Sequence, residues 1–480
     1  MTLFWYDIET FGRNPQMDRI AQFAGVRTDD KFQVIEKPLI IYCRITPDYL
    51  PDPASCLITG ITPFETLEKG VSEYEFIKRI NEEFSRPGTC VVGYNNLRFD
   101  DEFIRNCYYR NFFDPYLREW ANNNSRWDII DLVRITRDLR PGGINWPEDD
   151  NGKPIFKLEK LTKANSISHE NAHDALSDVH ATIALAKLVH KAQPRLFEYI
   201  FKNRTKEAVK KHINLHTKKP FLHTSGMFTT ERGCTSIVVP LAVDPGNNNC
   251  ILSYDLRYNP ENLLKLPIEE IRRLIFTPAG QLDKNEERIH IKGIHVNKCP
   301  VIAPVSTMKN PEKLGIDLDQ ALRYLKILKQ DKLITQKIIK VFEKKSYPDH
   351  KDPDLQIYSG GFFKDIDKTN FDIIHNTKPE KLSELQLSFE DRRIPEMLWR
   401  FIGRNYPETL NPEEQKKWKS FCAGRILFPP AGDIMDLGNF EKKLKALSLS
   451  KEIDGGQKMV IKELEKYKDF IKKEVLDYPD

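Results

Sequence analysis

The sequence predicts an α/β domain at the amino terminus, followed by a β-rich domain and then by an all-α domain. Three observations predict this order. Strand-like and helix-like segments alternate up to about residue 194, short apolar runs follow, and helical patterns dominate from about Leu355. We place the domains at residues 1–194, 195–346 and 352–480. The 480 residues are enough for about three domains of ordinary size.

The chain opens with a short apolar strand that leads into two acidic residues. Residues 3–6 are apolar or aromatic, and Asp7 and Glu9 follow them. Side chains alternate along a strand, so Asp7 and Glu9 share one face at its carboxyl end. An acidic pair in a chain with 70 acidic residues is more often a solvated edge. Solvated charges are not expected directly after an aromatic strand, which makes both residues candidate ligands.

A second predicted strand, over residues 90–94, also leads to acidic residues. Residues 95–96 are a turn signal, and residues 99–104 resemble the first turn of a helix. The helix dipole alone favours acids at such a position, so capping is the alternative for all three acids found there. We select Asp100 as a candidate because it directly follows the apolar Phe99.

The most specific element is a helix predicted over residues 174–190. Its apolar residues recur at helical spacing, at positions 175, 176, 179, 183, 186 and 189. Asp178 lies one turn inside this helix. His173 precedes it by five residues, about 140° round an ideal helix, so His173 cannot share its face as a helical residue. We expect His173 on the preceding loop, folded over the site as a general base, and a capping or surface histidine is the alternative.

The middle of the chain predicts a small β-rich domain. Residues 235–242, 251–256 and 289–296 are alternating or apolar, with a turn signal at residues 244–247. Apolar residues at helical spacing predict one amphipathic helix over residues 318–342, which closes the domain. A linker rich in proline and charge follows, and a helix rich in lysine and glutamate is predicted around residues 460–475.

Four carboxylates in one pocket would repel each other strongly unless cations neutralised them. Asp7, Glu9, Asp100 and Asp178 together therefore predict a divalent-metal site. Two hard cations that face a phosphate are typical of a phosphodiester hydrolase.

The same residues form a pattern that resembles the histidine branch of the DEDD exonuclease superfamily. Its parts are Asp-x-Glu on a first strand, Asn-x-x-Phe-Asp in the middle and His-x-x-x-x-Asp on a late helix. Further segments resemble the bacterial exonuclease I family. They are residues 57–63, 94–102, 124–128, 143–148, 161–165, 193–197, 297–301 and 404–410. The resemblance covers nearly the whole chain and is densest in the first 200 residues.

The resemblance implies a ribonuclease H-like exonuclease domain, an SH3-like β-rich domain and an all-α carboxyl-terminal domain. It also implies a processive 3′-to-5′ exonuclease that degrades single-stranded DNA to 5′-mononucleotides in DNA repair or recombination. Asp7, Glu9, Asp100 and Asp178 would hold two Mg²⁺ ions about 4 Å apart, for which Mn²⁺ can substitute. His173 would complete the catalytic set.

Basic and aromatic residues supply the candidate contacts to the DNA strand. Residues 202–219 contain seven lysines or arginines against one acid, and backbone phosphates bind such cations without regard to sequence. Aromatic rings suit single strands because unpaired bases stack on them, although most rings here are expected in the core. Lys157 stands where the family commonly carries an arginine, and lysine lacks the bidentate fork. The candidates are Glu9, Phe11, Arg105, Tyr116, Trp120, Arg134, Arg140, Lys157 and Tyr199.

The resemblance implies one protein partner, the acidic tail of single-strand-binding protein, with Lys309, Arg140 and Tyr199 as candidate contacts. We expect a monomer. No run approaches the roughly 18 apolar residues of a membrane span, and no signal peptide is apparent, which favours a cytoplasmic protein. The eight cysteines show no Cys-x-x-Cys pair and are predicted to be reduced core thiols.

Two alternatives stay open. The first is a DEDD exoribonuclease, because metals that grip phosphate do not separate DNA from RNA. The long β-rich and helical additions favour a strand-threading DNA enzyme over a compact RNA-trimming enzyme. The second is a non-catalytic module for single-strand binding or recruitment, which is disfavoured because all five catalytic positions carry competent residues.

Overall fold

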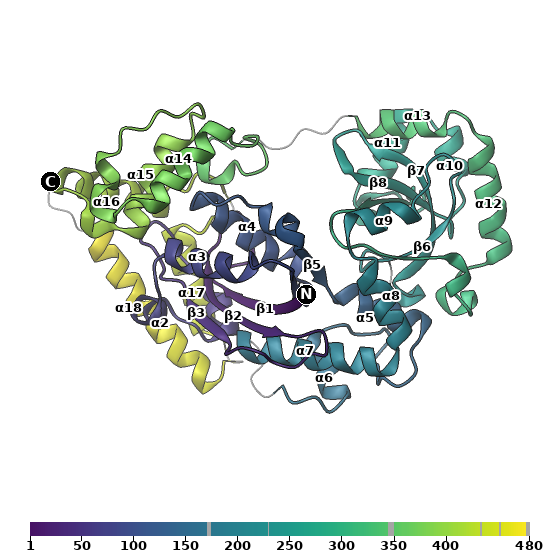
Figure 1. The fold of residues 1–480 in the computed structure, drawn as a ribbon, viewed down its shortest axis with the longest axis horizontal. Helices are drawn as coiled ribbons and strands as arrows, with labels where there is room; N and C mark the ends of the chain where they lie inside the picture. Colours follow the sequence, from purple (N-terminus) through teal and green to yellow (C-terminus); the bar gives the residue numbers. More distant parts are fainter. Residues whose placement is uncertain (170–173, 229, 344–349, 433, 451–452, 477–480) are drawn as a thin grey trace. The chain divides into compact units, whose positions relative to one another are not determined.

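Figure 1 shows the computed structural model of the chain, which describes residues 1–169, 174–228, 230–343, 350–432, 434–450 and 453–476. The chain forms two compact units. The first consists of Met1–Ser125, Glu170–His180 and Tyr347–Asp480, and the second of Arg126–His169 and Ala181–Ser346. The predicted all-α domain, residues 352–480, therefore packs in one unit with the amino-terminal strands.

A mixed β-sheet lies at the centre of the first unit. Its strands there are β1 (Thr2–Thr10), β2 (Ile20–Thr28), β3 (Leu39–Tyr42) and β4 (Thr89–Gly93), in the order β3-β2-β1-β4. A further strand, β5 (Ser125–Asp128), begins at the last residue of the unit's first segment. β1 pairs antiparallel with β2 and parallel with β4, so both of its edges are satisfied. This central position explains why the apolar start of β1 is buried.

Helices of the first unit accompany this sheet, and three of them begin with a side-chain cap. Asp52, Thr62 and Ser72 each accept a hydrogen bond from the first turn of the helix that they precede, as capping residues do. The helices are α1 (Pro53–Thr59), α2 (Pro63–Lys69), α3 (Glu73–Phe84), α4 (Asp100–Arg110) and α7 (Ala175–Ala192), of which α7 begins in this unit. The strand predicted at residues 90–94 and the helices predicted from residues 99 and 174 are confirmed.

The carboxyl-terminal part of the first unit is helical, as predicted, and its described residues from 350 onward contain no strand. Its helices are α14 (Asp365–Asn376), α15 (Ile394–Asn405), α16 (Pro412–Leu427), α17 (Leu437–Ser448) and α18 (Gly455–Val475). Both α17 and α18 pack on α1, and α18 also packs on α2. Phe64 of α2 meets Tyr467 of α18 edge to face at 5.8 Å. The two ends of the chain thus share one hydrophobic core.

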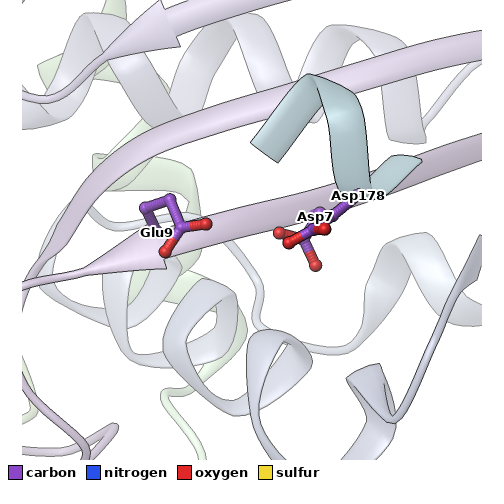
Figure 2. A group of neighbouring side chains, drawn as sticks. All are labelled: Asp7, Glu9 and Asp178. Carbon is purple, nitrogen blue, oxygen red and sulfur yellow. The ribbon is translucent and has the colours of Figure 1, made fainter. Parts of the chain in front are cut away.

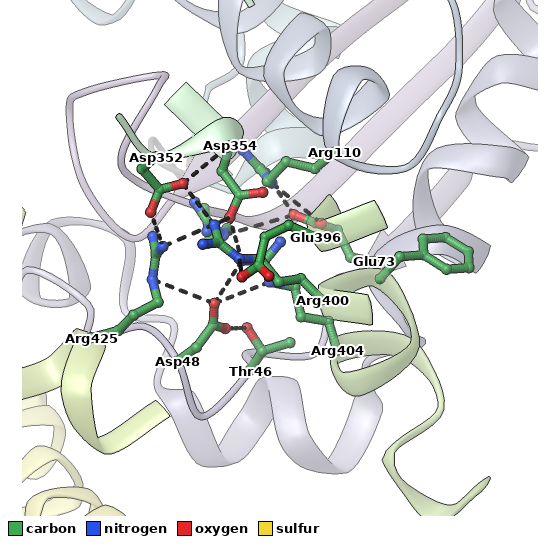
Figure 3. A network of polar contacts seen from close by, with 12 residues as sticks. Thr46, Asp48, Glu73, Arg110, Asp352, Asp354, Glu396, Arg400, Arg404 and Arg425 are labelled. Carbon is green, nitrogen blue, oxygen red and sulfur yellow. Dashed lines mark hydrogen bonds and ion pairs between the residues drawn. The ribbon is translucent and has the colours of Figure 1, made fainter. Parts of the chain in front are cut away.

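A buried ionic network joins the amino-terminal and carboxyl-terminal parts of the first unit (Figure 3). Arg404 contacts Asp48 at 2.8 Å and Asp354 at 2.6 Å, and its side chain is 2% exposed. Arg400 and Arg425 add further pairs to Asp352 and Asp354. Burial alone would raise the pKa of Asp48, but Arg404 and Arg425 outweigh it and hold that pKa below its usual range. The pKa of Asp354 is lowered in the same way, against burial, by Arg404 and Arg400.

This network predicts acid instability with a defined sign. A carboxylate whose pKa is lowered in the folded state stabilises the fold above its unfolded pKa of about 4 and loses that contribution below it. We therefore expect the free energy of unfolding to fall as the pH drops below about 4. Urea unfolding followed by tryptophan fluorescence between pH 7 and pH 3 measures it. Asp354→Asn should show a shallower decline, and equal slopes in both proteins would contradict this origin.

An antiparallel sheet lies at the centre of the second unit. Its strands are β6 (Phe221–Thr224), β7 (Thr235–Asp244), β8 (Asn247–Asp255), β9 (Ile291–His295) and β10 (Val301–Ala303), in the order β10-β6-β7-β8-β9. The three strands predicted from the sequence are confirmed as β7, β8 and β9. The predicted turn joins β7 to β8, where Asp244 pairs with Asn247.

The helices of the second unit correct one prediction. They are α5 (Ile130–Leu139), α6 (Leu158–Ala164), α8 (Pro194–Lys202), α9 (Lys206–His212), α10 (Glu261–Lys265), α11 (Ile268–Phe276), α12 (Leu318–Gln330) and α13 (Ile334–Phe342). The single helix predicted over residues 318–342 is wrong, because α12 ends at Gln330. Asp331 has an extended backbone, and its carboxylate accepts the Leu333 N–H at 2.7 Å in place of a helical bond.

Two bulk predictions can be compared with the structure. All eight cysteines are buried and free of disulfide bonds, as predicted. None of the described helices combines the length and the apolar character that a membrane span requires.

Candidate metal centre

Three carboxylates from two distant parts of the sequence meet in the first unit. Asp7 and Glu9 lie on β1, and Asp178 lies in the first turn of α7 (Figure 2). One carboxylate oxygen of each lies within 4.8 Å of one from each of the others. Asp7 and Glu9 lie on one face of β1, as the strand alternation predicts, and both are close to Asp178.

Asp100 lies close to this group but outside it. It is the first residue of α4, and it is buried. Its charge acts on both acidic residues of β1, where it raises the pKa of Asp7 and of Glu9. The structure therefore brings all four predicted carboxylates into one electrostatic environment, with three of them at the distance of shared coordination.

Burial and mutual repulsion disfavour the ionised forms of the carboxylates in this site. Burial raises the pKa of Asp7 well above its usual range, and Asp100, Glu9 and Asp178 raise it further. Burial and then the charges of Asp178 and Asp100 raise the pKa of Glu9 to about 9. Divalent cations reverse such shifts because they stabilise the ionised carboxylates. A donor set made only of carboxylate oxygens suits hard cations such as Mg²⁺ and Mn²⁺.

Asp174 holds Asp178 in place, and sequence reasoning missed it as a site residue. Its carboxylate accepts the Ser177 N–H at 3.1 Å, and its carbonyl accepts the Asp178 N–H at 3.0 Å. These bonds fix the first turn of α7. The charge of Asp174 also contributes to the raised pKa of Asp7 and Glu9, so a fifth carboxylate acts on the site. Asp174 directly precedes α7, and this capping position could have identified it from the sequence.

His173 lies outside the described residues. Its assignment as the general base therefore stays a prediction. Among the predicted catalytic residues that the structure describes, Asp178 is the nearest to His173 in the sequence.

Comparison with known proteins places the whole chain in one family. The model of the exonuclease family matches residues 4–186, that of the exonuclease I SH3-like domain matches 204–344, and that of the exonuclease I C-terminal domain matches 351–471. Exodeoxyribonuclease I of Haemophilus influenzae is 46% identical over 429 residues, which are 88% of this chain and 90% of that protein.

The chain belongs to the exonuclease I family. Its fold agrees with solved members. Escherichia coli exonuclease I in complex with a dA16 oligonucleotide aligns with a TM-score of 0.93 at 42% identity, over 98% of this chain and 99% of that chain. The zinc-bound form of the complex of the E. coli enzyme with single-stranded DNA gives 0.92 at 43%, with the same shares covered. The fold class predicted from the sequence is confirmed, whereas the exact domain boundaries stay a prediction.

Two of the predicted stacking residues of this exonuclease I family member differ in their surroundings. Phe11 is 1% exposed and packs in the core of the first unit, so the structure does not support a stacking role for its ring. Trp120 is 68% exposed, and its ring is available to a base. The sequence could not separate them, because Phe11 belongs to a buried cluster that also includes residues from far along the chain.

The predicted phosphate contact Arg105 is already engaged. Its guanidinium pairs with Glu102 at 2.7 Å and with Glu119 at 2.6 Å, and it lies over the ring of Tyr116. These carboxylates neutralise its charge, so the structure does not support a direct contact with phosphate. Tyr116 is half-buried beneath it.

The remaining candidates lie in the second unit. Arg134 is half-buried and pairs with Asp131 at 2.7 Å. Arg140 is also half-buried and donates to two backbone carbonyl groups, at 2.6 and 3.0 Å. The other candidates are the exposed Lys157 and Lys309 and the half-buried Tyr199.

Proposed function

We propose that this protein is a metal-dependent 3′-to-5′ exonuclease that removes 5′-mononucleotides from single-stranded DNA in repair or recombination. The convergence of Asp7, Glu9 and Asp178 within 4.8 Å carries this proposal. Membership of the exonuclease I family supports it, since relatives named exodeoxyribonuclease I share 46% of their aligned residues with this chain.

Asp7, Glu9, Asp100 and Asp178 would hold two Mg²⁺ ions, with Mn²⁺ as a substitute. When bound, such ions polarise the phosphodiester and activate a water molecule for attack on it. The all-oxygen donor set supports this choice, and the zinc-bound E. coli relative supports divalent-cation binding in the family. The protein would contribute the four carboxylates, which β1, α4 and α7 hold in place.

His173 would take the proton of the attacking water on a ring nitrogen, because a neutral imidazole accepts protons near pH 7. Asp178 follows it by five residues at the start of α7. This short separation in the sequence supports a role for the imidazole beside the carboxylates.

The preference for DNA is supported by the oligonucleotide complex of the E. coli relative. The carboxylates alone would serve a DEDD exoribonuclease equally well. Trp120 would stack on a base, and Lys157, Arg134, Arg140 and Tyr199 would contact the strand, which suits processive degradation. The acidic tail of single-strand-binding protein would bind at Lys309, Arg140 and Tyr199. We propose a cytoplasmic monomer, and the eight free thiols support a reducing compartment.

A comparison of matched oligomers tests this function. With Mg²⁺, a 5′-labelled DNA single strand should shorten from its 3′ end and release 5′-mononucleotides, because cations held by the carboxylates would bind the terminal phosphodiester. The RNA of the same sequence should be degraded at least about tenfold more slowly, as expected for a site that discriminates by more than 1.4 kcal/mol. Excess chelator should abolish both reactions, and added Mg²⁺ or Mn²⁺ should restore them.

Three results would contradict the proposal. Faster cleavage of RNA would favour the exoribonuclease alternative. Undiminished activity in excess chelator would remove the metal chemistry. Tight binding of single strands without cleavage, in the presence of Mg²⁺, would favour a binding module.

A further inference from the structure

A buried hydrogen-bonded triad lies next to the metal centre in the sequence and packs behind it. The hydroxyl of Tyr6 donates to Asp101 Oδ1 at 2.5 Å, and Arg118 Nη2 donates to the same oxygen at 2.7 Å. All three residues are at most 2% exposed. Asp101 had the appearance of a capping residue in the sequence, but its carboxylate bonds across to β1 and to the short helix η2 (Leu117–Glu119).

Each of two triad members is the chain neighbour of a predicted metal ligand. Tyr6 precedes Asp7 on β1, and Asp101 follows Asp100 at the start of α4. Successive side chains of a strand point to opposite faces, and successive side chains of a helix lie about 100° apart. The bond between Tyr6 and Asp101 therefore ties β1 to α4 through the residues directly next to Asp7 and Asp100.

Packing fixes the triad in one arrangement. The ring of Tyr6 meets the ring of Phe84 edge to face at 5.1 Å. The guanidinium of Arg118 lies over the ring of Phe84, at 4.6 Å from its centroid. A buried carboxylate is costly unless it is paired and hydrogen-bonded, so Asp101 is stable only where both donors reach it. The distance between the first turn of α4 and β1 is thereby restricted.

We propose that Asp101, held by Tyr6 and Arg118, is a positioning residue that sets the spacing of Asp100 and Asp7 and so the affinity of the site for divalent metal. This inference rests on the proposed metal site. Groups that support metal ligands from outside commonly change metal affinity by about 10- to 100-fold when removed. The triad supports the ligands indirectly, because its hydrogen bond holds together β1, which carries Asp7, and α4, which carries Asp100.

Direct measurement of Mn²⁺ binding to the full chain tests the proposal, for example by calorimetry in the absence of DNA. Arg118→Leu and Tyr6→Phe should each bind Mn²⁺ about 10-fold or more weakly than the unsubstituted protein. The Mg²⁺ concentration for half-maximal nuclease activity should rise by the same factor, while the KM for DNA at saturating Mg²⁺ stays within twofold. Arg118→Lys, which retains a donor, should recover part of the affinity.

Arg110→Leu is the matched control. Arg110 also lies on α4 and pairs with Glu73 at 2.6 Å, with side chains 2% and 5% exposed. Its loss should lower the melting temperature and leave Mn²⁺ binding unchanged. Tyr6→Phe removes a single hydroxyl group, so it keeps the test decisive if Arg118→Leu does not fold.

Two outcomes would overturn the inference about the triad alone. One is Mn²⁺ affinity within twofold of the unsubstituted protein in a folded Tyr6→Phe variant. The other is an equal loss of affinity in Arg110→Leu, which would show a general effect of destabilisation. An unsubstituted protein that binds no Mn²⁺ would overturn the metal site itself, and with it this proposal.

Discussion

Asp178→Asn is expected to lower the rate of single-stranded DNA degradation by at least about a thousandfold, since bound cations supply several kcal/mol of transition-state stabilisation. Asp178 is one of the three carboxylates within 4.8 Å of each other, and an amide neither carries the charge nor replaces both oxygens. Release of mononucleotides from a labelled strand at saturating Mg²⁺ measures the loss.

The stability of this variant distinguishes a chemical effect from an unfolding effect. Asp178 raises the pKa of both Asp7 and Glu9, so its neutralisation relieves repulsion in the metal-free protein. We expect an unchanged or higher melting temperature without added metal. Asp367→Asn, at a fully buried carboxylate of α14, is the control and should keep the rate within about threefold of the unsubstituted protein. Full activity of Asp178→Asn, also when combined with His173→Ala, would contradict the assigned site.

Arg404→Met is expected to have the largest effect on stability, a loss of about 3–5 kcal/mol in the free energy of unfolding. Arg404 is the shared partner of Asp48 and Asp354, and its removal leaves two buried carboxylates without their nearest cation. Urea unfolding at pH 7, with the nuclease rate at the same temperature, measures the effect.

An exposed ion pair in the same unit provides the comparison. Lys443 contacts Asp52 at 2.9 Å, with its side chain 49% exposed. Lys443→Met should cost about 0–1 kcal/mol, because solvent screens such pairs. Similar losses for the two variants would mean that burial of the network contributes nothing, and a loss below about 1 kcal/mol for Arg404→Met would contradict its central role.

The sequence could predict those parts of the site that depend on local periodicity. Alternation along β1 placed Asp7 and Glu9 on one face, and helical spacing placed Asp178 one turn inside α7. The meeting of these elements was not encoded locally, and the motif resemblance supplied it. The order of the domains followed from the same periodicities, since strands and helices differ in apolar spacing.

The features that the sequence did not predict depend on tertiary packing or on single side-chain contacts. Phe11 is buried in a cluster that also contains residues of the carboxyl-terminal helices, and its neighbours in the sequence do not indicate this. The break at Asp331 depends on one side-chain hydrogen bond that competes with the helix. Arg105 was predicted to contact the DNA strand, and only the fold shows that Glu102 and Glu119 pair with its guanidinium.

The core shared by the two ends of the chain has a consequence for the timing of biosynthesis. The Tyr74 N–H donates to the side chain of Asn405, 331 positions later, and α18 packs on α1 and α2. Asn405 and α18 are synthesised long after the amino-terminal strands, so these strands wait for their packing partners during translation. We expect the nascent polypeptide to remain inert toward nucleic acid during that interval. Competence then arises only after α18 has emerged and packed on α1 and α2.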